Sequence, residues 1–260
     1  MEYKVCSFNL RVDVKVDGEN GFPYRKERIL KKIMEEKPDL IGFQEVTVSM
    51  RAWLEESLTG YVVVGLGREA GDKGESMTIA FRQDKFALYH LEHQWLSLTP
   101  QVPGSSYELD QSPYPRMFSA ARLCCKVDGT EFIFINTHLD HVGQTARVLG
   151  AIQLLQYVSV QTLPVILTGD FNAAPDNAAI RLITDNPYFP LRDLTGNLPG
   201  TFHNYGKIPP EKRIRIDYIF SNLESDPDRS YMMEDPADGF LSDHNPVCAF
   251  VEIGSPAENA

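Results

Sequence analysis

The stretch from Val165 to Asn172 reads Val-Ile-Leu-Thr-Gly-Asp-Phe-Asn, an apolar run that ends abruptly in polar residues. A short apolar run bounded by turn-forming residues is typical of a buried β-strand. Asp170 and Asn172 follow where the strand should end. Polar side chains at such a position either close a turn or contribute to a site at the edge of a sheet.

The same pattern recurs along the chain and indicates a sheet-rich fold. Short apolar runs predict strands at 3–9, 39–44, 61–65, 77–82, 86–94, 118–127, 131–137, 164–170, 214–220 and 247–252. Amphipathic stretches predict helices at 24–36, 47–58 and 143–160, the last with Val148, Ile152 and Leu155 at helical spacing. Many strands and a few helices favour two packed sheets covered by helices, an α/β sandwich.

The 260 residues contain no internal repeat and no linker rich in Pro, Gly or Ser. We therefore expect one domain over 1–253, followed by a loose tail at 254–260. No export signal or apolar run of about 18 residues is evident, which makes the cytoplasm the expected compartment. The cysteines lack metal or redox spacing, so Cys6, Cys124 and Cys248 are expected to pack as small hydrophobes.

The formal net charge of −11 bears on the substrate. Long nucleic acids are usually held by clustered Lys and Arg that displace counterions. An acidic chain is a poor general binder of polyanions, although a local basic groove is compatible with it. The charge therefore favours a short or small substrate over duplex DNA.

Polar residues that bear chemistry stand at the ends of several predicted strands. Each has a structural reading, since Asp and Asn close turns, Glu caps helices and a lone His is often a satisfied buried imidazole. Asp217 is different because it interrupts an apolar run, and a buried carboxylate is costly unless it is paired or metal-bound. Six such places in one chain favour a shared site. The residues are Asn9, Glu45, His138, Asp170, Asn172, Asp217, Asp243 and His244.

The residue types in this set fit one reaction. Mg²⁺ and similar cations prefer oxygen ligands and often take one or two carboxylates plus water and phosphate. Glu45 and Asp243 could supply the carboxylates, with Asn9 as a neutral oxygen ligand. The histidines and remaining carboxylates are suited to proton transfer and charge stabilisation. No G-x-S-x-G or G-x-x-x-x-G-K-[ST] motif supports acyl transfer or nucleotide-driven work.

The order of these motifs resembles that of the endonuclease/exonuclease/phosphatase superfamily. The motifs are Ser7-Phe8-Asn9, Gln44-Glu45, Asn136-Thr137-His138-Leu139, Gly169-Asp170-Phe171-Asn172, Arg215-Ile216-Asp217-Tyr218-Ile219-Phe220 and Ser242-Asp243-His244. The resemblance spans about residues 3–252. It implies a four-layer sandwich of two mixed β-sheets flanked by helices, and a phosphoesterase that depends on Mg²⁺ or Mn²⁺.

The resemblance also implies roles, residue by residue. Glu45 would be the principal metal ligand, with Asn9 and Asp243 near the metal. Asp170 would orient or deprotonate the attacking water, and Asn172 would steady the transition state. Asp217 would pair with His244 and hold that imidazole against the scissile phosphate, while His138 would be a second donor to phosphate oxygens.

The histidine at 138 narrows the choice among the branches of this superfamily. Members that cut DNA at abasic sites carry an Asn-x-Tyr-x-Pro-Asn stretch there, whereas the histidine version resembles phosphatases, sphingomyelinases, deadenylases and pancreatic-type deoxyribonucleases. Pro115-Arg116-Met117, Thr137-His138-Leu139-Asp140-His141 and Thr201-Phe202-His203 look most like a bacterial group distantly related to the deadenylases. Arg116, His141 and His203 are then candidate substrate contacts, each of which could equally be structural.

The segment 204–215 carries Lys207, Lys212, Arg213 and Arg215 just before Asp217. It is either a solvated loop or a phosphate-gathering lip of the site. No basic stripe interleaved with aromatic residues, the kind that stacks single-stranded bases, is present.

Three functions remain open on the sequence. The first is a metal-dependent hydrolase that uses activated water to cleave a small or short phosphate ester. The second is a nuclease acting on RNA or DNA, at a 3′ end or internally. The third is a non-catalytic binding protein on the same fold, disfavoured because every matched position is filled. Neither a membrane substrate nor an obligate protein partner is expected.

Overall fold

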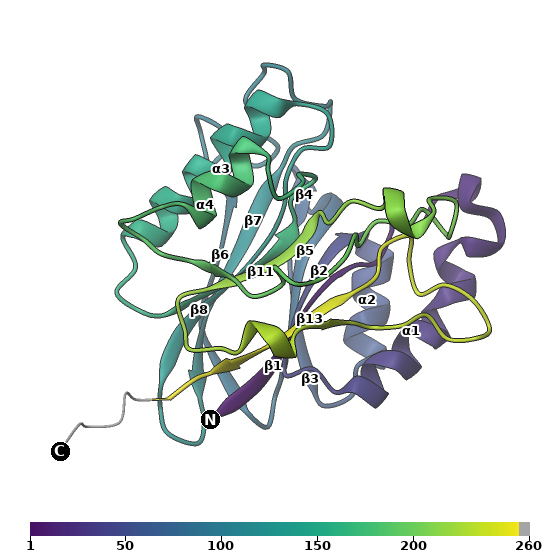
Figure 1. Ribbon diagram of the computed structural model, residues 1–260, viewed down its shortest axis with the longest axis horizontal. Helices are drawn as coiled ribbons and strands as arrows, with labels where there is room; N and C mark the ends of the chain where they lie inside the picture. Colours follow the sequence, from purple (N-terminus) through teal and green to yellow (C-terminus); the bar gives the residue numbers. More distant parts are fainter. Residues whose placement is uncertain (255–260) are drawn as a thin grey trace.

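The computed structural model describes residues 1–254 as two β-sheets packed face to face, with helices on both outer sides (Figure 1). The predicted α/β sandwich is therefore confirmed. The helices are α1 (Phe22–Glu36), α2 (Val48–Ser57), α3 (Gln144–Ser159) and α4 (Ala178–Thr184). The strands are β1 (Glu2–Asn9), β2 (Leu40–Val46), β3 (Tyr61–Val64), β4 (Gly67–Glu69), β5 (Lys73–Arg82), β6 (Phe86–Trp95), β7 (Met117–Cys125), β8 (Glu131–His138), β9 (Val165–Asp170), β10 (Arg192–Asp193), β11 (Asp217–Ser221), β12 (Tyr231–Met232) and β13 (Val247–Glu252).

Both sheets mix parallel and antiparallel pairs. The first has the order β12-β13-β1-β2-β5-β3, with β4 added beside β5, and the second has the order β10-β11-β9-β8-β7-β6. One parallel pair lies in each sheet, β1 with β2 and β8 with β9. Strand β11 runs antiparallel to β9 and places Asp217 opposite Asp170. The ends of β1, β2, β8 and β9 and the start of β11 thus meet at one edge.

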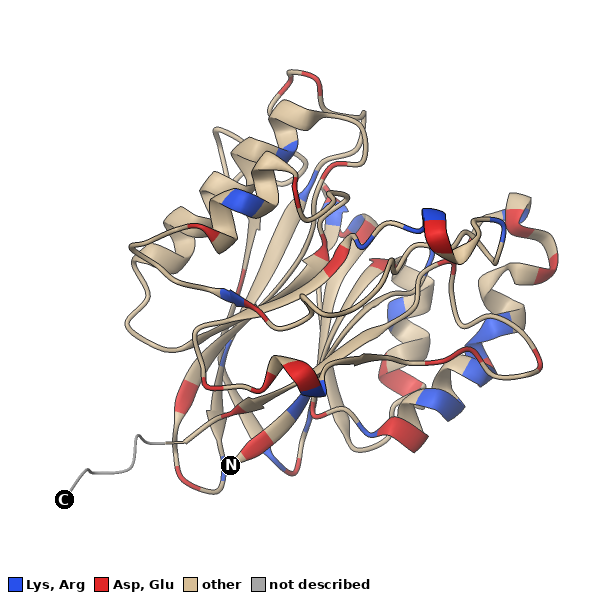
Figure 2. Ribbon diagram, in the orientation of Figure 1, with Lys and Arg blue, Asp and Glu red and all other residues tan. Residues whose placement is uncertain are grey.

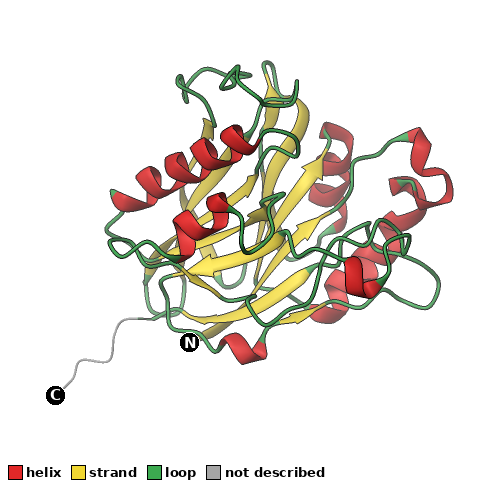
Figure 3. Cartoon of the chain, turned by 45° about the horizontal axis from the view of Figure 1, so that its top comes forward, coloured by secondary structure: helices red, strands yellow, loops and turns green. Residues whose placement is uncertain are grey.

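Three apolar layers hold the sandwich together. Residues such as Val5, Phe81 and Phe134 fill the space between the sheets. The helices α1 and α2 cover the outer face of the first sheet, and α3 and α4 cover that of the second (Figure 3). Burial of this apolar surface is the main favourable contribution to folding. All four cysteines are buried and free, which agrees with their predicted role as small hydrophobes.

The structure differs from the predicted elements in several places, among them the short strands β4, β10 and β12, which were not predicted. The predicted strand 214–220 begins only at Asp217, so this carboxylate starts β11 and does not interrupt it. The helix α4 was not predicted, because its 7 residues follow a turn and give little periodic signal. Helix α3 buries the small residues Ala146, Gly150 and Ala151 beside the large residues Leu154, Leu155 and Val158.

Leu139 and Leu96 approach α3 closely at Gly150, which explains why small residues lie on the buried face of the helix. A Cβ at this position would meet Leu139 and Leu96 at 3.1 and 3.2 Å. The first half of the helix therefore packs through its small residues, while Val148 and Ile152 are only half-buried.

No helix within residues 1–254 combines the length and apolarity needed to cross a bilayer. Apart from Gly254, the predicted tail at 254–260 lies outside the described residues.

Candidate active site

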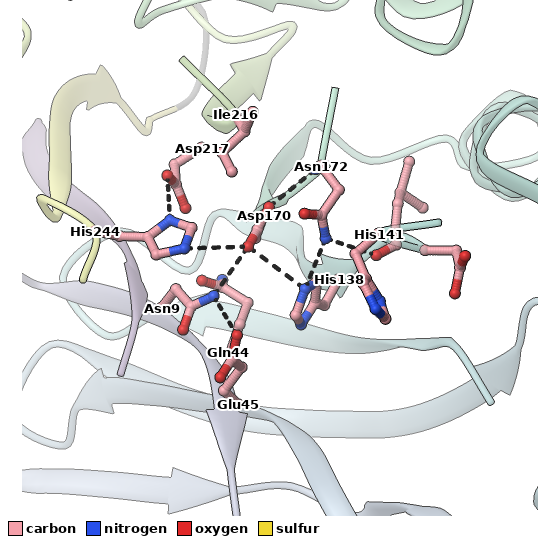
Figure 4. A network of polar contacts seen from close by, with 12 residues as sticks. Asn9, Gln44, Glu45, His138, His141, Asp170, Asn172, Ile216, Asp217 and His244 are labelled. Atoms are coloured by element: carbon pink, nitrogen blue, oxygen red, sulfur yellow. Dashed lines mark hydrogen bonds and ion pairs between the residues drawn. The ribbon is translucent and has the colours of Figure 1, made fainter. Parts of the chain in front are cut away.

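The polar residues predicted at strand ends converge on one cluster (Figure 4). Asn9 ends β1, His138 ends β8 and Asp170 ends β9. Asn9 crosses between the sheets, since its Nδ2 donates to Asp170 Oδ2 at 2.9 Å and to Glu45 Oε1 at 3.0 Å. A single amide thus joins the carboxylates of the two sheets.

Glu45 is held by an irregularity in β2. The pairing of β2 with β5 shifts register between Phe43 and Val46, and Glu45 has a φ of 60°, an unusual value for a non-glycine residue. Strain of this kind is common where a side chain must be directed into a site. Burial acts to raise the pKa of Glu45, but the Val12 N–H, which donates to Oε2 at 2.8 Å, and the Asn9 amide lower it overall. The carboxylate is therefore held ionised.

Asp170 lies at the centre of the cluster. Its Oδ1 accepts from the backbone N–H of Asn172 at 2.9 Å, and its Oδ2 lies 3.4 Å from His138 Nε2 and 3.9 Å from His244 Nε2. Burial and the neighbouring Asp217 raise the pKa of Asp170 to about 7, although His244 opposes the shift. A carboxylate with this pKa is suited to exchange a proton near neutral pH.

His244 and Asp217 form a buried pair. His244 Nδ1 lies 2.9 Å from Asp217 Oδ2, the same oxygen that accepts from Thr201 Oγ1 at 2.5 Å. Burial acts to lower the pKa of His244, but the charge and hydrogen bond of Asp217 raise it well above the ordinary value. The imidazole is therefore held protonated, with Nε2 directed towards Asp170 (Figure 4).

His138 is held in the opposite charge state. Burial, followed by the charges of Arg116 and Arg68, lowers its pKa well below the ordinary value, so the ring is neutral. Asn172 Nδ2 donates to the Leu139 carbonyl at 3.0 Å and lies 3.0 Å from His138 Nε2. Since the first contact fixes the amide orientation, Nε2 accepts and the proton lies on Nδ1.

The acidic residues suit a divalent cation. Glu45, His138 and Asp170 offer ligand atoms within 4.8 Å of one another, as do Asp170, Asp217 and His244. Burial and then the charge of Glu45 contribute to raising the pKa of Asp243, so the carboxylates of Glu45 and Asp243 destabilise each other's charge. A cation bound by oxygen ligands would relieve this repulsion. In the group of Asp170, Asp217 and His244, the last two residues are already hydrogen-bonded to each other. Glu45 is therefore the better centre for a metal.

A cavity of about 440 Å³ opens over the cluster. We call one part of its lining the strand-end wall, formed by Glu45, His138, Asp170, Asn172, Asp243 and His244, and another part the arginine wall, formed by Arg68, Glu75, Tyr114, Arg116 and His141. Arg11, Val12, Phe202, Ile214 and Ile216 complete the lining. Asn9 and Asp217 do not line the cavity and act through the residues that they contact.

The structure brings two of the three predicted substrate contacts to the cavity. Arg116 and His141 line it, and they contact each other through Nη2 and Nδ1 at 2.8 Å. His203 does not line it, because its ring is buried against Phe240. Burial lowers the pKa of His203 to about 4, so it remains a neutral packing residue. No local sequence pattern distinguishes His203 from His141 as a cavity residue.

The basic segment 204–215 does not form a phosphate-gathering lip. Arg215 is buried, donates to Asp193 at 2.7 Å and lies over the Tyr218 ring. Lys207 and Lys212 are exposed, and the segment contributes Ile214 rather than a cation to the cavity. Figure 2 shows Lys and Arg interspersed with Asp and Glu along the described chain. The solvated-loop interpretation therefore fits this segment better.

Sequence reasoning missed Arg68, Glu75 and Tyr114. The first two come from the hairpin of β4 and β5, and Tyr114 comes from the loop before β7. Arginine, glutamate and tyrosine in exposed-looking segments carry no periodic signal. Only Pro115-Arg116-Met117, beside Tyr114, had indicated that this loop reaches the site.

Two packed mixed sheets with a carboxylate–histidine cluster at one edge place the chain among four-layer α/β sandwich proteins. The model of the endonuclease/exonuclease/phosphatase family matches residues 6–244. The chain belongs to this family, whose members include phosphoesterases and nucleases. No curated protein sequence matches it significantly.

Solved structures agree with this assignment. An endonuclease/exonuclease/phosphatase from Bacteroides vulgatus is 30% identical with a TM-score of 0.90, covering 98% of this chain and 100% of that chain. The mannosyl-6-phosphatase of Bacteroides thetaiotaomicron is 31% identical with a TM-score of 0.81, covering 97% and 99%. The catalytic domain of human Nocturnin shares the fold at 19% identity, with a TM-score of 0.75 and coverage of 97% and 95%.

Proposed function

We propose that this protein is a divalent-metal-dependent hydrolase of a small phosphate ester, cleaved by direct attack of water. One observation carries the proposal: Asp170, with a pKa of about 7, lies between a protonated His244 and the ionised Glu45 in a single cavity. Hydrolysis of a phosphate ester by water requires a base, for which Asp170 is suited, and a positive charge to stabilise the developing negative charge, which His244 supplies. It also requires a carboxylate that can bind a metal, for which Glu45 is suited.

Glu45 would hold the cation, with Asp243 and Asn9 beside it. When bound, Mg²⁺ or Mn²⁺ would polarise the phosphate and neutralise charge that develops on its oxygens. Asp170 would accept the proton of the attacking water. Asn9, which donates to both Asp170 and Glu45, keeps the proposed base at a fixed distance from the metal ligand.

His244 would bind the phosphate as a charged donor. Asp217 fixes the tautomer and favours the imidazolium, so Nε2–H faces the cavity. Asn172 acts mainly by holding His138, since both of its amide contacts are made within the protein. This differs from the direct transition-state contact that the family resemblance implies for Asn172.

A sugar phosphate is the substrate class that we favour. The 31% identical relative is a mannosyl-6-phosphatase that is covered almost completely by the match. A cavity of about 440 Å³ is of the size that holds small molecules. Glu75 and Tyr114, which both contact Arg68, would offer hydroxyl partners and an apolar ring face for a sugar. The net charge of −11 also favours a small anion over a polymer.

A substrate screen tests the proposal. Purified protein with Mg²⁺ or Mn²⁺ is assayed for phosphate release from hexose phosphates, nucleotides and other monoesters, and for cleavage of labelled oligonucleotides. We expect the highest kcat/KM on a sugar phosphate, and no turnover after chelation or in Glu45→Gln. Preferred cleavage of oligonucleotides would replace the proposal by the nuclease function, and inactivity on every ester with every cation would refute hydrolysis.

A further inference from the structure

Two arginines of the arginine wall and His138 of the strand-end wall contain buried nitrogen atoms that have no partner. Within residues 1–254, Arg68 Nε, Arg116 Nη1 and His138 Nδ1 are all buried without a hydrogen bond, and all three side chains line the cavity. Arg68 is 4% exposed and Arg116 is 5% exposed. An unsatisfied buried donor is costly, most of all on a charged group. Such atoms are expected to face a ligand that supplies the missing acceptors.

Contacts with Asp140 and His141 hold the Arg116 side chain in place. Its Nε lies 3.3 Å from Asp140 Oδ2, and its Nη2 contacts His141 Nδ1 at 2.8 Å. Asp140 in turn accepts from the N–H groups of Ser112, Val142 and Gly143 at 3.1, 3.0 and 2.7 Å. The guanidinium is therefore oriented before any ligand binds, and Nη1 is the part left without a partner.

Arg68 is fixed in a similar way. It donates through both terminal nitrogens to Glu75 at 2.8 and 2.9 Å, and the Tyr114 ring lies 4.7 Å from its guanidinium carbon. Arg68 and Arg116 line the same cavity as His138, and their charges contribute to lowering the pKa of His138. The arginine wall thus presents two fixed cations to the cavity that His138 also lines.

We infer that the arginine wall binds the third non-bridging oxygen of a terminal phosphate, which makes the protein selective for phosphomonoesters over phosphodiesters. The inference rests on the proposed function and specifies its substrate class. A monoester has three non-bridging oxygens, whereas a diester has two and carries a second ester group. In the proposed function, a cation held at Glu45 and the imidazolium of His244 would bind the other two oxygens. Arg116 Nη1–H and His138 Nδ1–H, supported by the charge of Arg68, would bind the third.

The test compares two esters with the same leaving group, 4-nitrophenyl phosphate and methyl 4-nitrophenyl phosphate. Arg116→Met should lower kcat/KM for the monoester by about 10- to 100-fold, the range for a hydrogen bond to a charged group. The methyl diester should lose less than about threefold, because its methyl group replaces the oxygen that the arginine binds. Arg116→Lys should fall between Arg116→Met and wild type.

Arg147→Met is the matched control. Arg147 also bonds to Asp140, through the backbone carbonyl at 2.9 Å, but does not line the cavity. The control should leave the ratio of monoester to diester activity unchanged. Equal losses of both esters in Arg116→Met, or no loss of either, would overturn the inference.

Ligand binding separates this inference from the proposed function. Calorimetry with Mg²⁺ should show that Arg116→Met weakens inorganic phosphate binding at least about tenfold and leaves dimethyl phosphate unaffected. Circular dichroism confirms that the variant is folded. If the wild-type protein hydrolyses no ester, the proposed function is refuted. The measurement of phosphate binding would still test whether Arg116 binds a phosphate oxygen. Unchanged phosphate affinity in a folded Arg116→Met would refute the inference alone.

Discussion

The two walls of the cavity are built differently. In the strand-end wall, most polar atoms bond to one another, and Asp170 alone contacts Asn9, Asn172, His138 and His244. The arginine wall comes from a hairpin and loops, and its arginines retain nitrogens without partners. Sheet register therefore assembles the carboxylate–histidine cluster, whereas connecting segments contribute most of the arginine wall.

The two walls also differ in what their substitution should change. Loss of a strand-end residue should reduce the chemical step on every substrate. Loss of an arginine-wall residue should alter the preference between substrates.

The largest effect is expected at Glu45. Glu45→Gln keeps the shape of the side chain but removes the charge that would hold the cation. We expect kcat/KM to fall by at least about a hundredfold on every substrate, because metal-based charge stabilisation is lost. Steady-state kinetics at saturating Mg²⁺ measure the loss. The exposed Glu69→Gln on β4 is the control, and near-normal activity in Glu45→Gln would refute the metal assignment.

The second prediction concerns the His244–Asp217 pair. Asp217→Asn and His244→Ala should each slow turnover strongly, by about a hundredfold, because a preorganised charged donor is lost in both. The double variant should be little worse than either single variant, since the two residues act as a unit. Activity assays on the three variants test this, and fully additive losses would show that the pair does not act together.

The third prediction uses the raised pKa of Asp170. Its pKa of about 7 lies above the ordinary value for Asp of about 3.9, so the folded protein binds more protons between these pH values than the unfolded chain. Without metal, stability should therefore fall as pH rises through this range. Asp170→Asn cannot ionise and should be more stable than wild type at pH 8.

The stability advantage of Asp170→Asn should be smaller at pH 5 than at pH 8, by at least about 1 kcal/mol. Urea denaturation of both metal-free proteins at each pH measures the difference. An advantage that does not change with pH would mean that Asp170 has an ordinary pKa. The same variant should be inactive, so stability and activity oppose each other at this residue.

The smallest effect is expected outside both walls. Lys212 and Arg213 do not line the cavity, so replacing both with Gln should leave kcat/KM within about twofold. The dependence of KM on salt should be shallow, because few phosphates are contacted. Kinetics at several NaCl concentrations check both points. A steep salt dependence on oligonucleotides, with activity that grows with chain length, would favour a nuclease.

Much of the strand-end wall was predictable because its signal is local. A polar residue after an apolar run is visible in sequence, as at Asp170, and the ordered motifs linked these positions. The roles of the pairs were harder to predict. That Asp217 begins β11 and faces Asp170 depends on an antiparallel register that no local pattern encodes.

The arginine wall was mostly not predictable for the opposite reason. Arg68 and Glu75 have ordinary surface-like neighbours in sequence, and their burial comes from packing of the β4–β5 hairpin beside the loop that carries Tyr114. His203 and His141 follow similar sequence patterns, but only His141 reaches the cavity. Long-range packing decided between them.

The sandwich and the residues that gather at the strand ends were predictable from the sequence, because apolar periodicity and polar interruptions are local properties of the chain. The family was predictable because the ordered motifs resemble those of its members. The charge states and the arginine wall depend on the tertiary structure. Burial and the charge of Asp217 raise the pKa of Asp170. Burial acts to lower the pKa of His244, but Asp217 raises it overall, whereas burial near two arginines keeps His138 neutral. These shifts depend on distances between residues far apart in sequence, since both desolvation and Coulomb interactions act through space.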